Sequence, residues 1–266
     1  AQLNALMKDT AIYGLSSIVG RFLNYLLVPL YTHYMPAASG DYGVNTNIYA
    51  YTALVLVILT FGMETTLFRF ANDTPSLQKG GTNIVGMGKR WSDTVFSTAL
   101  LTVGVLATVF LIAMFSCIRP VSEALGYAAH PEYLLMMSVV VALDALQAIP
   151  FSYLRFQKRA VRFASLKLLF VVLNIGMNVV FFVVLGKTAV FYVFFINLLC
   201  TSFITLFFIP DLLRVRWHVD TGLLRRMLAY SWPILVLGIA GILNQTADKM
   251  LFPYLYDGAD MHAPLG

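Results

Sequence analysis

The sequence predicts an all-α polytopic membrane protein with about seven transmembrane helices. Hydrophobic residues make up 59% of the 266 residues and charged residues only 12%, whereas a soluble domain carries about 25% charged residues. The mean hydropathy is +0.77. Each long apolar stretch has to form a helix, because the hydrocarbon core of a bilayer cannot satisfy open backbone hydrogen-bonding groups.

A helix needs about 20 apolar residues to cross a bilayer, and stretches of that length fill most of the chain. They lie at residues 10–34, 44–66, 93–118, 134–154, 163–185, 189–209 and 229–256. The first is too long for a signal peptide and has no small-residue cleavage site, so we expect it to remain as a helix. Cys117 and Cys200 both fall in these stretches. We expect buried apolar thiols there and no disulfide or metal site.

Basic residues fall almost entirely on alternate connections between the apolar stretches. This set comprises Lys8, Arg69, Lys79, Lys89, Arg90, Arg155, Lys158, Arg159, Arg162, Lys167, Arg214, Arg216, Arg225 and Arg226. The opposite connections hold only Arg119 and Lys187. The positive-inside rule therefore predicts a bacterial inner-membrane protein with a cytoplasmic N-terminus. The pI of about 9.2 then reflects basic loops that lie beside anionic lipid. These loops either only set the orientation of the protein in the membrane or also bind specific lipid headgroups. The pI does not call for a nucleic-acid partner.

Arg21 lies near the middle of the first apolar stretch. Facing lipid at that depth would cost about 2.5–3.5 kcal/mol. Ser17, Arg21 and Asn24 recur at helical spacing, so they share one polar stripe. Arg21 either pairs with a buried carboxylate and holds helices together, or faces a cavity and grips an anionic substrate through its guanidinium. We favour the second interpretation, with Arg21, Asn24 and Ser17 as substrate-binding residues.

Four further charges are candidates for ion coupling or gating. Asp144 lies halfway along the fourth stretch and is either the partner of Arg21 or a coupling-ion site. Glu64 and Arg69 end the second stretch but are offset by about 140° around a helix, so each is expected to have another partner. Arg69 either extends its cation to the membrane interface or forms, with Glu64, part of a gating contact at the cytoplasmic mouth. Asp248, in the outer part of the seventh stretch, shares a helix face with small and polar residues and is expected to face a lumen.

Six short segments carry a resemblance to a known family. They are Lys8-Asp9-Thr10-Ala11-Ile12-Tyr13-Gly14 with Pro29-Leu30-Tyr31-Thr32, Gly62-Met63-Glu64 to Arg69-Phe70, Pro150 to Phe163, Tyr230-Ser231-Trp232-Pro233, and Asp248-Lys249. Together they resemble the polysaccharide flippases of the multidrug/oligosaccharidyl-lipid/polysaccharide exporter superfamily. The resemblance implies twelve to fourteen helices in two bundles around a central cavity. It also implies a carrier that moves undecaprenyl-diphosphate-linked oligosaccharides from the cytoplasmic to the periplasmic leaflet by alternating access.

The same resemblance predicts how this chain is divided. We expect it to be the N-terminal half of a two-bundle exporter. Residues 1–210 would form the first six-helix bundle, residues 211–228 a basic cytoplasmic connection, and residues 229–266 the first helix of a truncated second bundle.

Two other functions stay open, a cation-coupled multidrug antiporter of the same superfamily and an intramembrane glycosyl or acyl transferase. The sequence carries no HExxH, GxSxG, P-loop or GxGxxG motif. We therefore expect a transporter and not an enzyme, with no cofactor. Its expected partners are a lipid-linked oligosaccharide, the bilayer and H⁺ or Na⁺, and we expect a monomer.

Overall fold

The computed structural model describes Gly14 and residues 27–35, 40–73, 84–213 and 220–255, with the backbone alone at 84–88 and 252–255. All regular structure in these residues is helical. The helices are α2 (Leu27–Tyr34), α3 (Asp41–Thr60), α4 (Met63–Asn72), α5 (Ile84–Ser116), α6 (Ile118–Ala124), α7 (Pro131–Phe156), α8 (Ala160–Val179), the π-helical η3 (Val180–Val184), α9 (Val190–Leu213) and α10 (Thr221–Leu255). The prediction of an all-α protein is confirmed.

Six segments of the described chain are long and apolar enough to cross a membrane. They are Asp41–Asn72, Lys89–Ser116, Pro131–Phe156, Ala160–Val184, Val190–Leu213 and Thr221–Leu251. These correspond to the second through seventh predicted stretches, so the polytopic architecture is confirmed. Most of the first predicted stretch lies outside the described residues.

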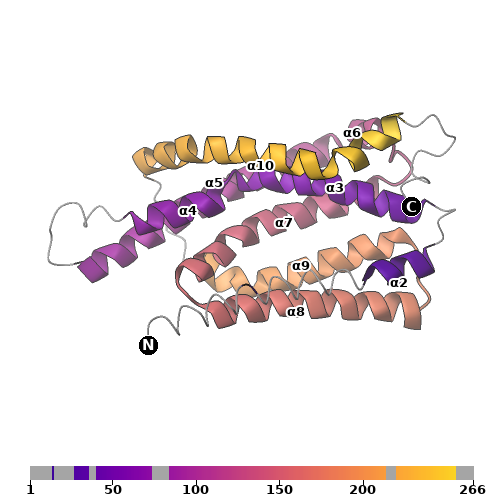
Figure 1. Ribbon diagram of the computed structural model, residues 1–266, viewed down its shortest axis with the longest axis horizontal. Coiled ribbons are helices and arrows are strands. Elements are labelled where there is room, and N and C mark those ends of the chain that lie inside the picture. The colour runs from indigo at the N-terminus through magenta and orange to yellow at the C-terminus, as the bar shows by residue number, and fades with distance from the viewer. Residues whose placement is uncertain (1–13, 15–26, 36–39, 74–83, 214–219, 256–266) are drawn as a thin grey trace.

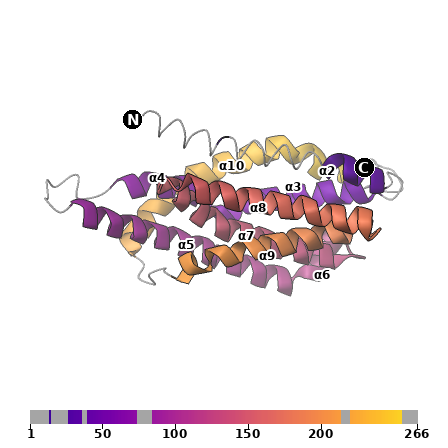
Figure 2. The ribbon, with the colours of Figure 1, turned by 90° about the horizontal axis from the view of Figure 1, so that it is seen from below.

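The helices run side by side in one elongated bundle, with α7 in its interior (Figures 1 and 2). α7 packs against α3, α4, α5, α8 and α9, and 61% of its most apolar stretch is buried. The end of α4, the start of α5, the end of α7, the start of α8, the end of α9 and the start of α10 lie at one end of the bundle, and α2 and α6 lie at the other (Figure 1). The helix ends that flank the basic stretches of the sequence therefore gather at a single end, which we call the basic end. Its cytoplasmic location stays a prediction.

A sharp break divides the second apolar stretch into α3 and α4. Phe61 and Gly62 both take left-handed backbone angles, with φ of 49° and 66°. Gly62 also has no room for a side chain, since a Cβ there would lie 2.9 Å from Cγ2 of Ile234 in α10. At Gly238 of α10, a Cβ would lie 2.8 Å from Cγ1 of Val57 in α3. The two glycines thus allow α10 to pack closely against α3 and α4.

Hydrogen bonds reinforce this contact at both ends of α10. The hydroxyls of Thr66 and Ser231 share a hydrogen bond, and both residues are fully buried. Toward the other end, the Asn47 amide donates to the backbone carbonyl of Lys249 at 2.7 Å. The Asn47 side chain also accepts a hydrogen bond from the Tyr127 hydroxyl at 2.7 Å. One buried amide therefore joins α3 to α10 and to the connection before α7.

The expectation of two buried cysteines is half right. Cys200 is buried in α9, but Cys117 is exposed. Helix α5 ends at Ser116, one residue earlier, and Cys117 lies at the start of the short helix α6. The thiol therefore lies at a helix boundary outside the packed interior.

Candidate functional site

A cavity of about 390 Å³ lies beside α7 and contains four charged side chains. α7 supplies Asp144, Gln147, Phe151 and Arg155 to it, at a spacing that places them on one helix face. Glu64 enters from α4 and Lys167 from α8. We call this space the charged cavity. It brings two carboxylates and two cations together between helices that are long enough to span a membrane.

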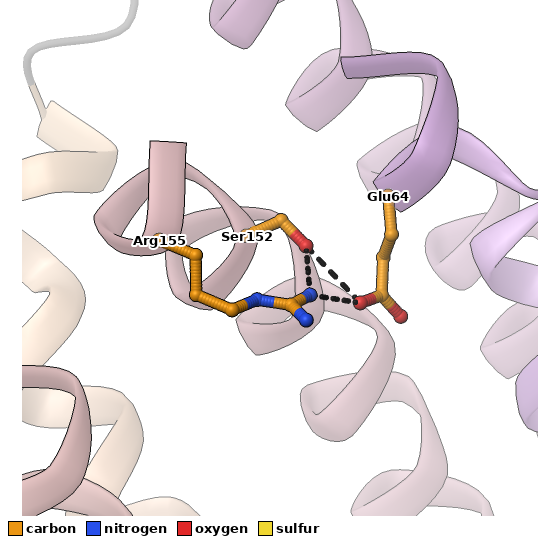
Figure 3. Close-up of polar contacts among 3 residues, drawn as sticks. All are labelled: Glu64, Ser152 and Arg155. Atoms are coloured by element: carbon orange, nitrogen blue, oxygen red, sulfur yellow. Dashed lines mark hydrogen bonds and ion pairs between the residues drawn. The ribbon is translucent and has the colours of Figure 1, made fainter. Parts of the chain in front are cut away.

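An ion pair in the charged cavity joins α4 to α7. Arg155 Nη2 lies 3.2 Å from Oε2 of Glu64. The Ser152 hydroxyl donates to the same carboxylate oxygen at 3.1 Å and accepts from Arg155 Nη2 at 2.9 Å. Figure 3 shows the Arg155 and Glu64 side chains pointing toward one another, with Ser152 beside them. The side chains of Arg155 and Glu64 remain 39% and 41% exposed, so a ligand in the cavity could reach this pair.

Aromatic rings hold the Arg155 guanidinium in place. Its Cζ lies 5.5 Å from the ring centre of Phe68 in α4 and 5.8 Å from that of Phe163 in α8. Arg155 Nε is buried and has no hydrogen-bond partner in the part of the chain that the structure describes. Buried donors are nearly always paired in native proteins. The Arg155 guanidinium therefore keeps one donor that no described residue accepts from.

Asp144 and Lys167 form a second group of opposite charges in the same cavity. They come from the facing helices α7 and α8. The two charges attract each other electrostatically, and the Lys167 ammonium is also attracted by the Glu64 carboxylate. The Lys167 ammonium lies 4.2 Å from the ring centre of Phe151, a cation–π contact that keeps it over α7.

A second cavity, of about 330 Å³, adjoins the charged cavity and shares Asp144 and Phe170 with it. Hydroxyls and amides line it: Tyr31, Tyr49, Asn174 and Asn197. The Asn197 amide donates to the Tyr49 hydroxyl at 2.8 Å, and the Tyr31 hydroxyl donates to the buried Asn178 at 2.9 Å. A polar lining therefore continues from Arg155 past Asp144 toward the end of the bundle that carries α2.

The structure separates the predicted coupling and gating residues. Glu64 and Asp144 line the charged cavity. Arg69 does not line it, because its guanidinium lies 4.8 Å from the ring centre of Tyr230 and joins α4 to α10. Asp248 is exposed on α10, also away from the cavity lining. The expectation that Glu64 and Arg69 have separate partners is confirmed.

The three predicted substrate-binding residues, Arg21, Asn24 and Ser17, lie outside the described residues. Their role and the pairing of Arg21 with Asp144 stay predictions. Sequence reasoning missed Arg155 and Lys167 as cavity residues because it counted them among the orienting cations of a cytoplasmic connection. One signal was present: Arg155 follows Asp144 by eleven residues, about three helical turns, and so shares its face.

Comparison with known proteins gives one match. A family model described as "Polysaccharide biosynthesis protein" matches residues 6–263, nearly the whole chain. Searches of curated proteins and of solved structures returned no significant match.

Proposed function

Because the chain belongs to the polysaccharide biosynthesis protein family, we propose that it carries a polyprenyl-diphosphate-linked oligosaccharide from the cytoplasmic to the periplasmic leaflet by alternating access. The protein is a multi-pass membrane protein of polysaccharide biosynthesis and transport. Our proposal adds the substrate, the direction and a bacterial inner membrane with the N-terminus in the cytoplasm.

The charged cavity is the observation that carries this proposal. A diphosphate brings negative charge into the bilayer, where an unpaired charge costs several kcal/mol. Arg155 and Lys167 place two cations in a cavity between helices that are long and apolar enough to span a membrane. A guanidinium binds phosphate oxygens with paired hydrogen bonds, and an ammonium adds a point charge. Arg21 would add a third cation if it faces the same space, as the sequence predicts.

Exchange of ion pairs offers a mechanism. Without substrate, Glu64 neutralises Arg155 and links α4 to α7. A half-exposed pair of this kind contributes about 0–1 kcal/mol in water, so a diphosphate could displace the carboxylate. The ion pair between α4 and α7 would then break as the substrate binds. Binding in the cavity would therefore shift the populations of two helix arrangements, one with this ion pair and one without it.

The released carboxylate gives a place for ion coupling. In our proposal, Glu64 or Asp144 takes up H⁺ or Na⁺ during the cycle. The division into a first bundle (1–210), a connection (211–228) and the first helix of a second bundle (229–266) stays part of the proposal, in which the α10 contacts with α3 and α4 would be the contact between the two bundles. A rocking motion of one bundle against the other would expose the charged cavity to each leaflet in turn.

Transport by charge-neutral variants tests the proposal. Lys167→Gln and Arg155→Gln should each lower the rate at which a fluorescent polyprenyl-diphosphate oligosaccharide crosses proteoliposome leaflets by roughly tenfold or more, since each removes a charge-assisted contact of about 1.5–3 kcal/mol. Lys187→Gln is the matched control, because Lys187 is exposed in the α8–α9 connection. Unchanged transport by both cavity variants at equal reconstitution would overturn the proposal.

A further inference from the structure

A second charged pocket lies on another face of α7 and shares no lining residue with the charged cavity. It has a volume of about 300 Å³ and lies between α5, α7, the start of α8 and the end of α9. α7 contributes Pro150, Tyr153 and Leu154, and Gln157 follows directly after its end. We call it the basal pocket, because Gln157, Arg159 and Asp211 of its lining lie at or beside the helix ends that meet at the basic end of the bundle.

Three cations and two carboxylates line the basal pocket: Lys89, Arg159, Arg162, Asp93 and Asp211. Both carboxylates are already engaged. Arg162 Nη2 lies 2.6 Å from Asp211 Oδ2 and also donates to the Phe207 carbonyl at 3.2 Å. The Tyr153 hydroxyl donates to Asp93 at 2.6 Å.

The side chains of Lys89 and Arg159 are the two cations of this pocket that the carboxylates do not neutralise. Neither side chain has a hydrogen bond or ion pair with any other residue that the structure describes. The first turn of α8, which begins beside Arg159, carries no acidic residue to offset them. The pocket therefore has a positive balance and two cations available to a ligand.

The position of the basal pocket indicates the kind of anion. Its lining residues Gln157, Arg159 and Asp211 lie at or beside the ends of α7, α8 and α9, which are long and apolar enough to span a membrane. A basic pocket between transmembrane helices is a known type of site for anionic headgroups. α9, which supplies Asp211, also exposes the apolar side chains of Leu206, Ile209 and Leu213. A lipid bound here could lay its acyl chains along such a surface.

We propose that the basal pocket binds the phosphate of an anionic phospholipid headgroup, with Lys89 and Arg159 as its principal contacts. Because the lining comes from α5, α7, α8 and α9, the bound lipid would join these four helix ends. The proposal does not depend on the transported substrate, since it concerns a different face of α7 and its test measures binding alone.

Native mass spectrometry of the chain in a neutral detergent tests this site. Phosphatidylglycerol should bind more tightly than phosphatidylcholine, and the Lys89→Gln/Arg159→Gln double variant should weaken phosphatidylglycerol binding by about fivefold per cation removed, at about 1 kcal/mol each. Arg225→Gln is the matched control, because Arg225 is exposed on α10 at the same end of the bundle and does not line the pocket. Its binding should equal that of the unmodified chain.

A charge-increasing variant guards against a trivial loss of folding. Asp211→Asn releases Arg162 from its ion pair and should strengthen phosphatidylglycerol binding by about fivefold, a gain that misfolding would not produce. Equal affinity for the two lipids, or no response to either pocket variant, would overturn the proposal. Full displacement of the lipid by millimolar inorganic phosphate would overturn the lipid assignment and identify a soluble phosphate as the ligand.

Discussion

The carboxylate of Glu64 accepts two hydrogen bonds on one oxygen, from Ser152 and from Arg155. If a diphosphate binds Arg155, it competes with this carboxylate. Glu64→Gln keeps the length of the side chain and an oxygen for Ser152 but removes the competing charge. We expect farnesyl diphosphate, a short soluble probe, to bind the variant up to about fivefold more tightly, which corresponds to about 1 kcal/mol of lost competition.

Fluorescence competition binding in detergent measures this change. The matched control is Glu123→Gln, because Glu123 is exposed on α6 at the other end of the bundle. Weaker binding by Glu64→Gln would mean that the carboxylate helps to hold the ligand and does not compete with it, contrary to the proposed exchange.

Arg21 carries a prediction that rests on the sequence alone. A cation near the middle of a membrane-spanning stretch is tolerated where it meets a partner or a cavity. Arg21→Ala should abolish or strongly reduce surface polysaccharide while the protein level in the membrane stays unchanged. Arg119→Ala, at an exposed position on α6, is the control. Normal polysaccharide in the Arg21 variant would remove this residue from the proposed substrate site.

At the residue level, the sequence identified the cavity acids but not their partners. Glu64 and Asp144 were noticeable because a carboxylate inside an apolar stretch needs an explanation. Arg155 and Lys167 lie near a basic connection, where the positive-inside rule already accounts for a cation. Only the packing of α4, α7 and α8 shows that these four side chains share one cavity, because the hydropathy of a single helix does not reveal which neighbour it faces.

At the scale of elements, close packing of α10 on α3 depends on Gly238. A Cβ at this position would lie 2.8 Å from the branched, stiff side chain of Val57. Gly241, one turn further along α10, is its natural comparison, because a Cβ there would have no neighbour within 4 Å. The two glycines differ in their surroundings but not in helical context.

Gly238→Ala should therefore lower the melting temperature in detergent, since overpacking costs about 1–3 kcal/mol. Gly241→Ala should keep or raise it, because alanine is the better helix former by about 1 kcal/mol. Val57→Ala combined with Gly238→Ala should recover most of the loss by making room. Equal melting temperatures for the two alanine variants would show that α10 does not pack this closely.

The same elements show where prediction from hydropathy stops. The apolar stretches located the second to seventh spans, because burial in lipid demands long apolar runs. They did not reveal the break at Phe61 and Gly62 or the continuation of the helix to Asn72. The break and the continuation both depend on backbone conformation and on contact with α10. In addition, α4 mixes polar and apolar residues, so its average hydropathy is typical of a loop.

At the scale of the whole molecule, the two ends of the bundle differ in charge. The helix ends that flank the basic stretches share the basic end, and Cys117 lies near the opposite end at the start of α6 (Figure 1). The positive-inside rule therefore predicts that Cys117 lies on the periplasmic side. The chain supplies its own probe for this orientation, because Cys117 is exposed while its other cysteine, Cys200, is buried.

A membrane-impermeant maleimide should accordingly label Cys117 in right-side-out vesicles and should leave it unlabelled in inside-out vesicles. Cys117→Ser should abolish the signal, which confirms that buried Cys200 does not react. Adding Arg225→Cys to that background moves the thiol to the basic end, and the labelling pattern should reverse. If Cys117 instead reacted from the inside-out face, the basic end would be periplasmic, and the direction of transport proposed from the charge pattern would have to be inverted.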